Sequence, residues 1–151
     1  MRSISDRLLQ INPNKEYRPF DTLRAAPRDS HEIVLNVGRV SGRRFLKGRR
    51  VYLKDAGGRG LVGRGTVLEE RQPRAMPPWQ QQFLLLPYDP DQERALIQVD
   101  KLVEPPLSRT RLQKYPVFSE ATLFKDDKDT QGAVFRVATP TADVLDRLIG
   151  F

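Results

Sequence analysis

The strongest constraint on the fold of this chain is a pair of β-rich segments joined by a glycine turn. Residues 50–54 and 60–69 are rich in Val, Leu, Tyr and Thr, and they flank the sequence Asp55-Ala56-Gly57-Gly58-Arg59. Glycine reaches the positive φ angles that tight connections between antiparallel strands need. Gly63 and Gly65 interrupt the second segment, and glycine inside a strand is typical of a bend or a bulge. We therefore expect a β-hairpin within a small, strongly bent sheet.

The remaining segments predict further short strands, with helices at the edges of the sheet. Strands are expected at residues 8–11, 31–37, 83–88, 95–103 and 132–138, and the proline-containing residues 72–82 are expected to form a loop. Short helices are expected at residues 20–26 and 108–115, with Ser108 as the cap of the second. Thr139-Pro140 should open a last helix, residues 141–149, which Gly150 ends. The chain is therefore expected to be one α+β domain, residues 1–151, built on a bent sheet or barrel of about six strands with short flanking helices.

Size and composition further limit the class of protein to which this chain can belong. A chain of 151 residues can bury a core of its own, and the absence of cysteine excludes disulfides, thiolate zinc sites and a thiol nucleophile. The N-terminal residues have no apolar signal-like run, and no stretch approaches the ~20 apolar residues that a bilayer demands. We expect a soluble, cytoplasmic protein that does not associate with membranes.

Basic side chains are concentrated in residues 39–64. This stretch holds nine Lys and Arg and a single acid, Asp55, so its net charge is +8, against +7 for the whole chain. The rest of the chain is therefore close to neutral. A positive field concentrated in this way attracts a polyanion, and nucleic acid is the usual one. The alternative is a solvated hairpin whose Arg and Lys only keep the domain in solution.

Residues for catalysis or metal binding are sparse. His31 is the only histidine and there is no cysteine, so a Ser-His triad or a His-based metal site has too few members. The run Asp126-Asp127-Lys128-Asp129 is typical of a solvated turn. Gly57-Gly58-Arg59-Gly60 is not followed by the Gly-Lys-Ser/Thr of a phosphate-binding loop. We therefore expect a binding module and not an enzyme, with no cofactor and no metal.

Several short patterns follow one another along the chain. They are Asn12-Pro13-Asn14-Lys15 after the first strand, Ile33-Val34-Leu35-Asn36-Val37, Lys47-Gly48-Arg49-Arg50-Val51-Tyr52-Leu53, and the glycine-spaced residues 57–67. In this order they resemble the EVE domain family, a branch of the PUA-like superfamily. Two positions depart from the family pattern. Leu35 stands where EVE domains often carry a tryptophan, and Gly48-Arg49 stands in place of Gly-Asp.

The resemblance implies a PUA-like barrel that accepts a modified base in a pocket. EVE domains are similar in fold to readers of methylated RNA and to domains that take a flipped 5-modified cytosine from DNA. A flipped base needs a flat apolar surface to stack on, and amide or backbone groups at its Watson–Crick edge. The residues implied for this pocket are Asn12, Tyr17, Leu35, Asn36 and Trp79.

Each pocket residue also has a plainer explanation. Trp79, the only tryptophan, could stack on a base or fold back to plug one end of the barrel. Asn12 could present its amide to a base edge or form a turn before Pro13. Asn36 could present its amide in the same way, and Leu35 would supply an apolar wall in place of a ring. Tyr17 could supply a ring or belong to the core.

The basic stretch supplies the contacts to phosphate. The residues implied for them are Arg39, Arg43, Arg44, Lys47, Arg49 and Arg59. The function implied is recognition of DNA with a modified base, as the specificity domain of a modification-dependent restriction system with a fused or associated nuclease. The chain end at Gly150-Phe151 is compatible with a domain taken from a longer protein that continues into a nuclease. The alternative is an RNA-binding accessory domain that uses the basic hairpin without flipping a base.

Overall fold

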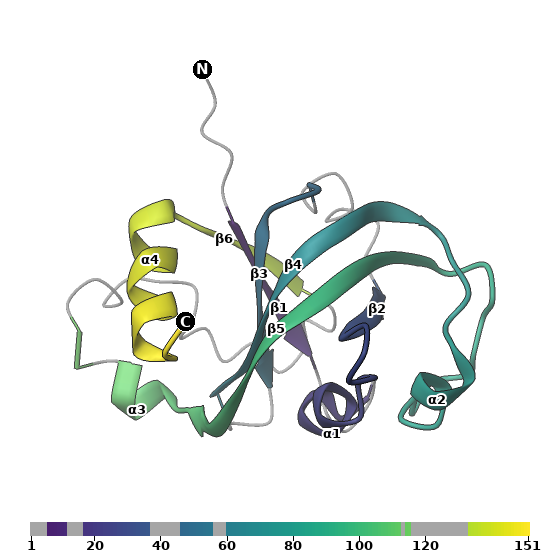
Figure 1. The fold of residues 1–151 in the computed structure, drawn as a ribbon, viewed down its shortest axis with the longest axis horizontal. Coiled ribbons are helices and arrows are strands. Elements are labelled where there is room, and N and C mark those ends of the chain that lie inside the picture. Colours follow the sequence, from purple (N-terminus) through teal and green to yellow (C-terminus); the bar gives the residue numbers. More distant parts are fainter. Residues whose placement is uncertain (1–5, 12–16, 37–45, 56–59, 113, 116–132) are drawn as a thin grey trace.

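The computed structural model describes residues 6–11, 17–36, 46–55, 60–112, 114–115 and 133–151. They form a curled six-stranded sheet with the strand order β2-β5-β4-β3-β1-β6 (Figure 1). The strands are β1 (Asp6–Ile11), β2 (Glu32–Asn36), β3 (Arg50–Asp55), β4 (Gly60–Pro73), β5 (Glu93–Leu107) and β6 (Ala133–Val137). Only β1 and β3 pair in parallel, and the other neighbours are antiparallel. The predicted α+β class and the bent sheet of about six strands are confirmed.

The described residues also form four short helices around this sheet. They are α1 (Pro19–Arg24), α2 (Pro78–Gln81), α3 (Arg109–Leu112) and α4 (Thr139–Leu148). The predicted caps are present, because the Ser108 hydroxyl accepts a hydrogen bond from the Arg111 N–H at 3.3 Å, and Gly150 has a φ of 78° after α4. In the described part of the chain even α4, with 10 residues, is much too short to cross a bilayer.

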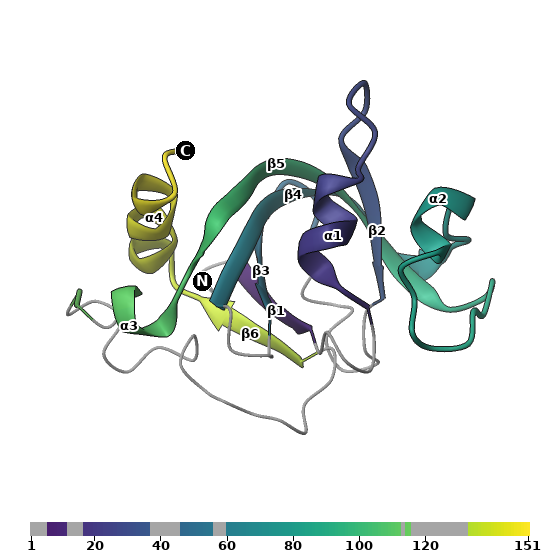
Figure 2. The same cartoon turned by 90° about the horizontal axis from the view of Figure 1, so that it is seen from below.

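The alternation of side chains along the strands gives the sheet two apolar faces. Successive residues of a strand point to opposite sides. Leu9 and Leu53 therefore join an inner cluster with Leu23 of α1, whereas Leu8 and Tyr52 join an outer cluster. The outer cluster includes Leu112 of α3, Ala142 and Leu145 of α4, and Ile149 directly after α4. Figure 2 shows α1 beside the curled strands β4 and β5, with α3 and α4 at the other end of the molecule.

Strands β4 and β5 are long, and their pairing bends where β4 carries glycine. The β4–β5 register shifts between Leu61 and Gly63 and again between Arg64 and Gly65. A Cβ on Gly63 would collide with the Leu23 side chain of α1, and one on Gly65 would lie 2.6 Å from the Gln98 carbonyl oxygen of β5. Both glycines are therefore needed for close packing, and the bend predicted at these two positions is confirmed.

The strand predicted at residues 83–88 is wrong, as is the expectation that residues 72–82 contain no regular element. Helix α2 lies within the predicted loop, and residues 83–88 make a single bridge, from Leu84 to Tyr17. Pro87 has no N–H to give to a sheet, and the Tyr88 hydroxyl accepts a hydrogen bond from the Met76 N–H at 3.0 Å. Leu85 and Leu86 consequently remain exposed.

Replacement of Gly65 by alanine tests the close approach of β4 and β5. Its Cβ would also lie 2.6 Å from Cγ2 of Ile97, so we expect Gly65→Ala to lower the free energy of unfolding by about 2–3 kcal/mol. Gly48→Ala is the control, because no atom lies within 4 Å of that Cβ and only its φ of 85° adds strain, about 1–2 kcal/mol. Urea unfolding monitored by circular dichroism measures both. Equal stability of Gly65→Ala and the unmodified chain would contradict the packing described here.

Candidate nucleic-acid interface

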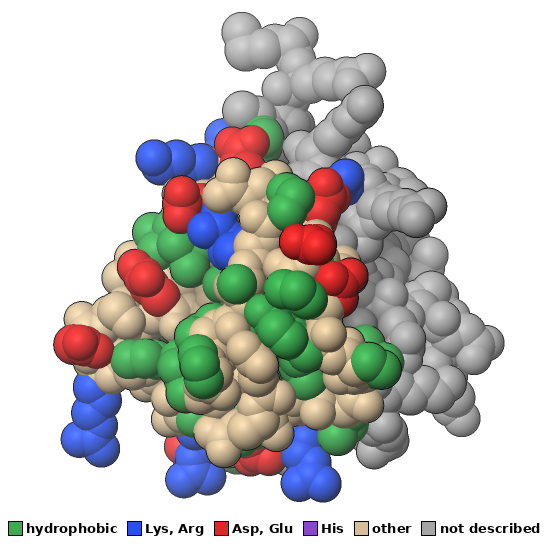
Figure 3. All heavy atoms as spheres, turned by 90° about the vertical axis from the view of Figure 1, so that its right-hand side faces the viewer, with side chains coloured by type: hydrophobic (Ala, Val, Ile, Leu, Met, Phe, Trp, Pro, Cys, Tyr) green, Lys and Arg blue, Asp and Glu red, His purple; other side chains and the backbone are tan. Residues whose placement is uncertain are grey.

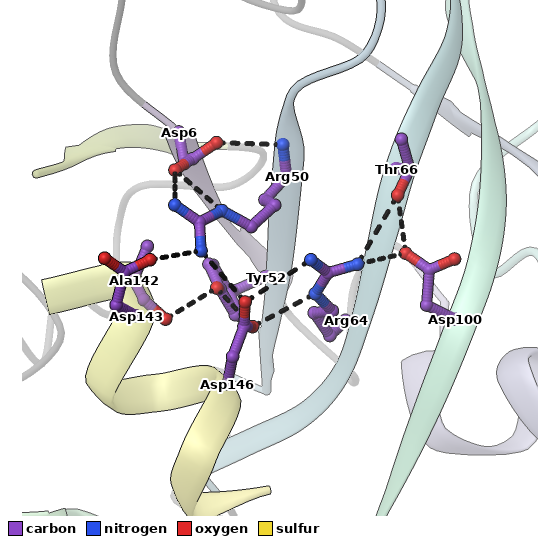
Figure 4. Close-up of polar contacts among 9 residues, drawn as sticks. All are labelled: Asp6, Arg50, Tyr52, Arg64, Thr66, Asp100, Ala142, Asp143 and Asp146. Atoms are coloured by element: carbon purple, nitrogen blue, oxygen red, sulfur yellow. Dashed lines mark hydrogen bonds and ion pairs between the residues drawn. The ribbon is translucent and has the colours of Figure 1, made fainter. Parts of the chain in front are cut away.

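Asp146 of α4 is the centre of a network of charges that joins the helix to the sheet (Figure 4). Its carboxylate accepts hydrogen bonds from Arg50 Nη1 at 2.9 Å, from the Tyr52 hydroxyl at 2.6 Å and from Arg64 Nε at 3.0 Å. The Asp146 side chain is only 14% exposed. Ionised donors and acceptors make stronger hydrogen bonds than neutral groups, so these contacts hold α4 firmly against β3 and β4.

The two arginines of this network have further acidic partners. Arg50 forms a two-point contact with Asp6 of β1, through Nε at 2.9 Å and Nη2 at 2.8 Å, and Nη1 also reaches Asp143 at 2.9 Å. Arg64 forms an ion pair with Asp100 of β5, whose carboxylate also accepts a hydrogen bond from Thr66 at 2.6 Å. Arg50 and Arg64 are therefore occupied within the protein.

Burial and pairing shift the pKa values of Asp146 and Arg50 in opposite directions, whereas both raise the pKa of Tyr52. Burial alone would raise the pKa of Asp146, but the hydrogen bonds from Arg64, Tyr52 and Arg50 outweigh it and lower that pKa. Burial tends to lower the pKa of Arg50, but its bonds to Asp143, Asp146 and Asp6 raise the value. The Tyr52 pKa is raised, first by burial and then by its bond to Asp146. All three groups keep their usual charge at neutral pH.

The network reduces the positive charge that residues 39–64 offer to a ligand. Of the nine cations in residues 39–64, Arg50 and Arg64 are neutralised by acids distant in the sequence, and Lys54 is only 8% exposed. Lys47 is exposed and Arg49 is half-buried, which leaves both near the surface ahead of β3. The other predicted phosphate contacts, Arg39, Arg43, Arg44 and Arg59, lie outside the described residues. The net charge of +8 therefore overstates the positive field that this stretch offers.

Three of the predicted pocket residues come together in the inner cluster. Leu35 is completely buried and Tyr17 is 5% exposed, and Trp79 is partly buried against the same cluster. Trp79 therefore packs against the core with only part of its side chain buried. Leu35 has no exposed surface, so it packs within the core and does not form the wall of an open pocket. Asn12 lies outside the described residues.

Asn36 lies on the opposite face of β2 from Leu35, because neighbouring side chains of a strand alternate. It pairs in register with Arg94 of β5, and its Oδ1 accepts a hydrogen bond from Arg94 Nε at 2.8 Å. The Arg94 side chain is buried, and that burial lowers its pKa. Since a guanidinium only donates, the amide oxygen of Asn36 must face Arg94. The structure thus separates Asn36 from Tyr17, Leu35 and Trp79.

Gln80 is a structural residue that the sequence analysis did not single out. Its carboxamide donates to the Val34 carbonyl at 2.6 Å and accepts from the Val34 N–H at 3.0 Å. These are the bonds that a neighbouring strand would make, and they cap the edge strand β2. Gln80 thereby fixes α2, and with it Trp79, beside β2. The only signal in the sequence was a run of three glutamines after Trp79.

The described residues show no cluster of side chains that could hold a metal ion. His31 is exposed directly before β2. Within the ranges that the structure describes, no three His, Asp or Glu residues are placed to share a metal ion.

The fold of the described residues, a curled six-stranded sheet with short flanking helices, is shared with several solved structures. No family model matches the sequence, and no curated protein matches it. Among solved structures, Rpa0253 from Rhodopseudomonas palustris has a TM-score of 0.64 at 14% identity, over 97% of this chain and 94% of that one. Human THYN1, in a complex with DNA containing 5-methylcytosine, has a TM-score of 0.62 at 14% identity, over 97% and 98%. The Mmi1 YTH domain has a TM-score of 0.56 at 13% identity, over 98% and 77%.

The stability of the fold should depend on Asp146 and on pH. Because the pKa of Asp146 is lower in the folded chain than the ~3.9 of a free Asp, its contribution is complete above that value and disappears as the pH falls through the folded pKa. We expect Asp146→Asn to lower the free energy of unfolding at pH 7 by about 2–4 kcal/mol, and this loss to shrink below about pH 4. Chemical unfolding between pH 3 and 7 measures it.

Asp143→Asn is the matched control for this experiment. Its side chain is 56% exposed and bonds to Arg50 alone within the network, so it should cost no more than about 1 kcal/mol. Equal losses for the two variants would show that Asp146 is not the centre of the network.

Proposed function

We propose that this chain is a nucleic-acid-binding module that recognises a modified base, most specifically a 5-modified cytosine in DNA. The observation that supports it is the similarity of fold, over 97% of the chain, to human THYN1 in a complex with DNA containing 5-methylcytosine. The net charge of +7 favours a polyanionic partner. The module binds and does not catalyse, so any cleavage of nucleic acid belongs to residues outside this chain.

In this proposal, stacking holds the base and positive charge holds the flanking phosphates. A base flipped out of its strand stacks on Trp79, with Tyr17 and Leu35 in the cluster against which the ring packs. Lys47 and Arg49 bind the flanking phosphates, together with Arg39, Arg43, Arg44 and Arg59. Asn12 offers its amide to the base edge, whereas Asn36 is bonded to Arg94 on the opposite face of β2 and takes no part in this pocket.

The finer biological role extends the same proposal. A module that distinguishes modified from unmodified DNA suits the specificity component of a modification-dependent restriction system in the cytoplasm. Its partner would be a nuclease, either fused to this chain or associated with it.

A second candidate is an RNA-binding accessory module that does not flip a base. The burial of Leu35 and Tyr17 favours it, because neither side chain presents an open surface to a base. In that case the basic residues would contact structured RNA through its backbone and shape. Equal affinity for modified and unmodified duplexes, with tighter binding to structured RNA, would support this candidate over the first.

The role of Trp79 is tested by two substitutions that keep an apolar side chain against the core. Trp79→Leu removes the flat ring, so it should reduce the preference for a 5-methylcytosine duplex at least about fivefold, whereas Trp79→Phe should retain most of it. Fluorescence anisotropy with matched modified and unmodified duplexes measures the ratio of the two Kd values. A preference that survives in Trp79→Leu would exclude stacking by this residue.

The role of the basic group is tested by its salt dependence. The double variant Lys47→Ala with Arg49→Ala should weaken binding to all duplexes alike, and the slope of log K against log salt should become shallower by about 2. Arg28→Ala, an exposed cation outside the predicted phosphate set, is the control and should change the slope little. Binding titrations at several salt concentrations measure these slopes. An unchanged slope in the double variant would remove both residues from the interface.

A further inference from the structure

Residues 85–91 form a continuous exposed segment with an apolar half and an acidic half. Every one of these residues is exposed, and Leu85, Leu86 and Tyr88 are 50%, 40% and 36% exposed. The segment follows α2, at the right of Figure 1, and Figure 3 shows that side of the molecule with apolar side chains gathered in its middle. Three large apolar side chains exposed within four residues form a patch that is typical of a binding surface.

Tyr88 and the acidic half of the segment are held in place by hydrogen bonds. The Tyr88 hydroxyl is bonded to the Met76 N–H at 3.0 Å, and the Tyr88 ring lies 5.2 Å from the buried Arg94 guanidinium. Asp89 accepts from the Asp91 N–H at 2.9 Å, and its carbonyl accepts from the Gln92 N–H at 3.2 Å. A surface ordered before binding loses little conformational entropy when a partner docks.

The charge of the segment indicates the kind of partner. Asp89 and Asp91 are both exposed, and neither forms a salt bridge with any residue that the structure describes. Two carboxylates beside the patch repel a phosphate backbone. They also oppose a symmetric dimer through this patch, because each copy would bring the same two charges. A partner with basic side chains beside its apolar ones fits the segment best.

We propose that residues 85–91 are a docking surface for another protein, through a segment that combines aliphatic or aromatic side chains with Lys or Arg. The inference is independent of the proposed nucleic-acid site, because it uses none of the residues assigned to base or phosphate.

The experiment selects peptides from a random phage-displayed library on the immobilised chain. Enriched peptides should combine apolar and basic residues, and synthetic copies should bind at least about tenfold more weakly to Leu85→Ser with Leu86→Ser. Asp89→Asn with Asp91→Asn should weaken binding several-fold and reduce its dependence on salt. Tyr115→Ser, at an apolar position 41% exposed elsewhere on the surface, should leave binding unchanged. Circular dichroism establishes that each variant is folded.

Several outcomes would overturn the proposal. They are peptides without the apolar and basic composition, equal binding to the double leucine variant and the unmodified chain, and an equal loss in Tyr115→Ser. Sedimentation that shows a dimer abolished by the leucine changes would assign the patch to a second copy of the chain. A loss of duplex affinity in the same variant would assign it to the nucleic-acid surface. Failure of the proposed function is distinct, since it would leave peptide binding intact.

Discussion

The arrangement of this protein depends on the pairing of Asp146 with Arg50, Tyr52 and Arg64. These contacts join the C-terminal helix α4 to the central strands β3 and β4, and Arg50 continues the network to Asp6 of β1. Arginine side chains so enclosed are costly to leave unpaired, and each therefore requires its acidic partner at one defined position. Apolar packing between α4 and the sheet would tolerate small shifts of the helix, whereas this set of directional bonds specifies one placement (Figure 4).

The same network separates two kinds of arginine that the sequence places side by side. Arg49 and Arg50 are neighbours, but Arg50 is bound to three aspartates while Arg49 remains half-exposed next to Lys47. Charge that holds the fold together is not available to a phosphate, because its field is cancelled by acids a few ångströms away. The positive surface of the described part of the chain is therefore smaller than the composition indicates.

At the end of the molecule that carries α2, polar side chains make hydrogen bonds that a further strand would otherwise make. Gln80 supplies to Val34 the two hydrogen bonds that another strand would make, and Arg94 joins Asn36 to the Arg74 carbonyl directly after β4. Trp79 is thereby set against the inner cluster, while the apolar and acidic residues 85–91 remain outside. The two ends differ in character: one is fixed by ion pairs between strands and a helix, and the other carries an exposed apolar patch.

Local sequence determined the features that depend on local geometry. The glycine-spaced hairpin, the bend at Gly63 and Gly65, the Ser108 cap and the last helix with its Gly150 end were all predictable, since backbone freedom and periodicity are properties of neighbouring residues. Of the candidate site, Tyr17, Leu35 and Trp79 share the inner cluster, but the sequence could not show that Leu35 is fully enclosed or that Asn36 faces the other way. Only the tertiary structure decided which arginines are paired and that residues 83–88 make no strand. Ion pairs such as Arg64 with Asp100 and Asp146 join residues separated by 36 and 82 positions, and no local pattern records a contact formed across such distances.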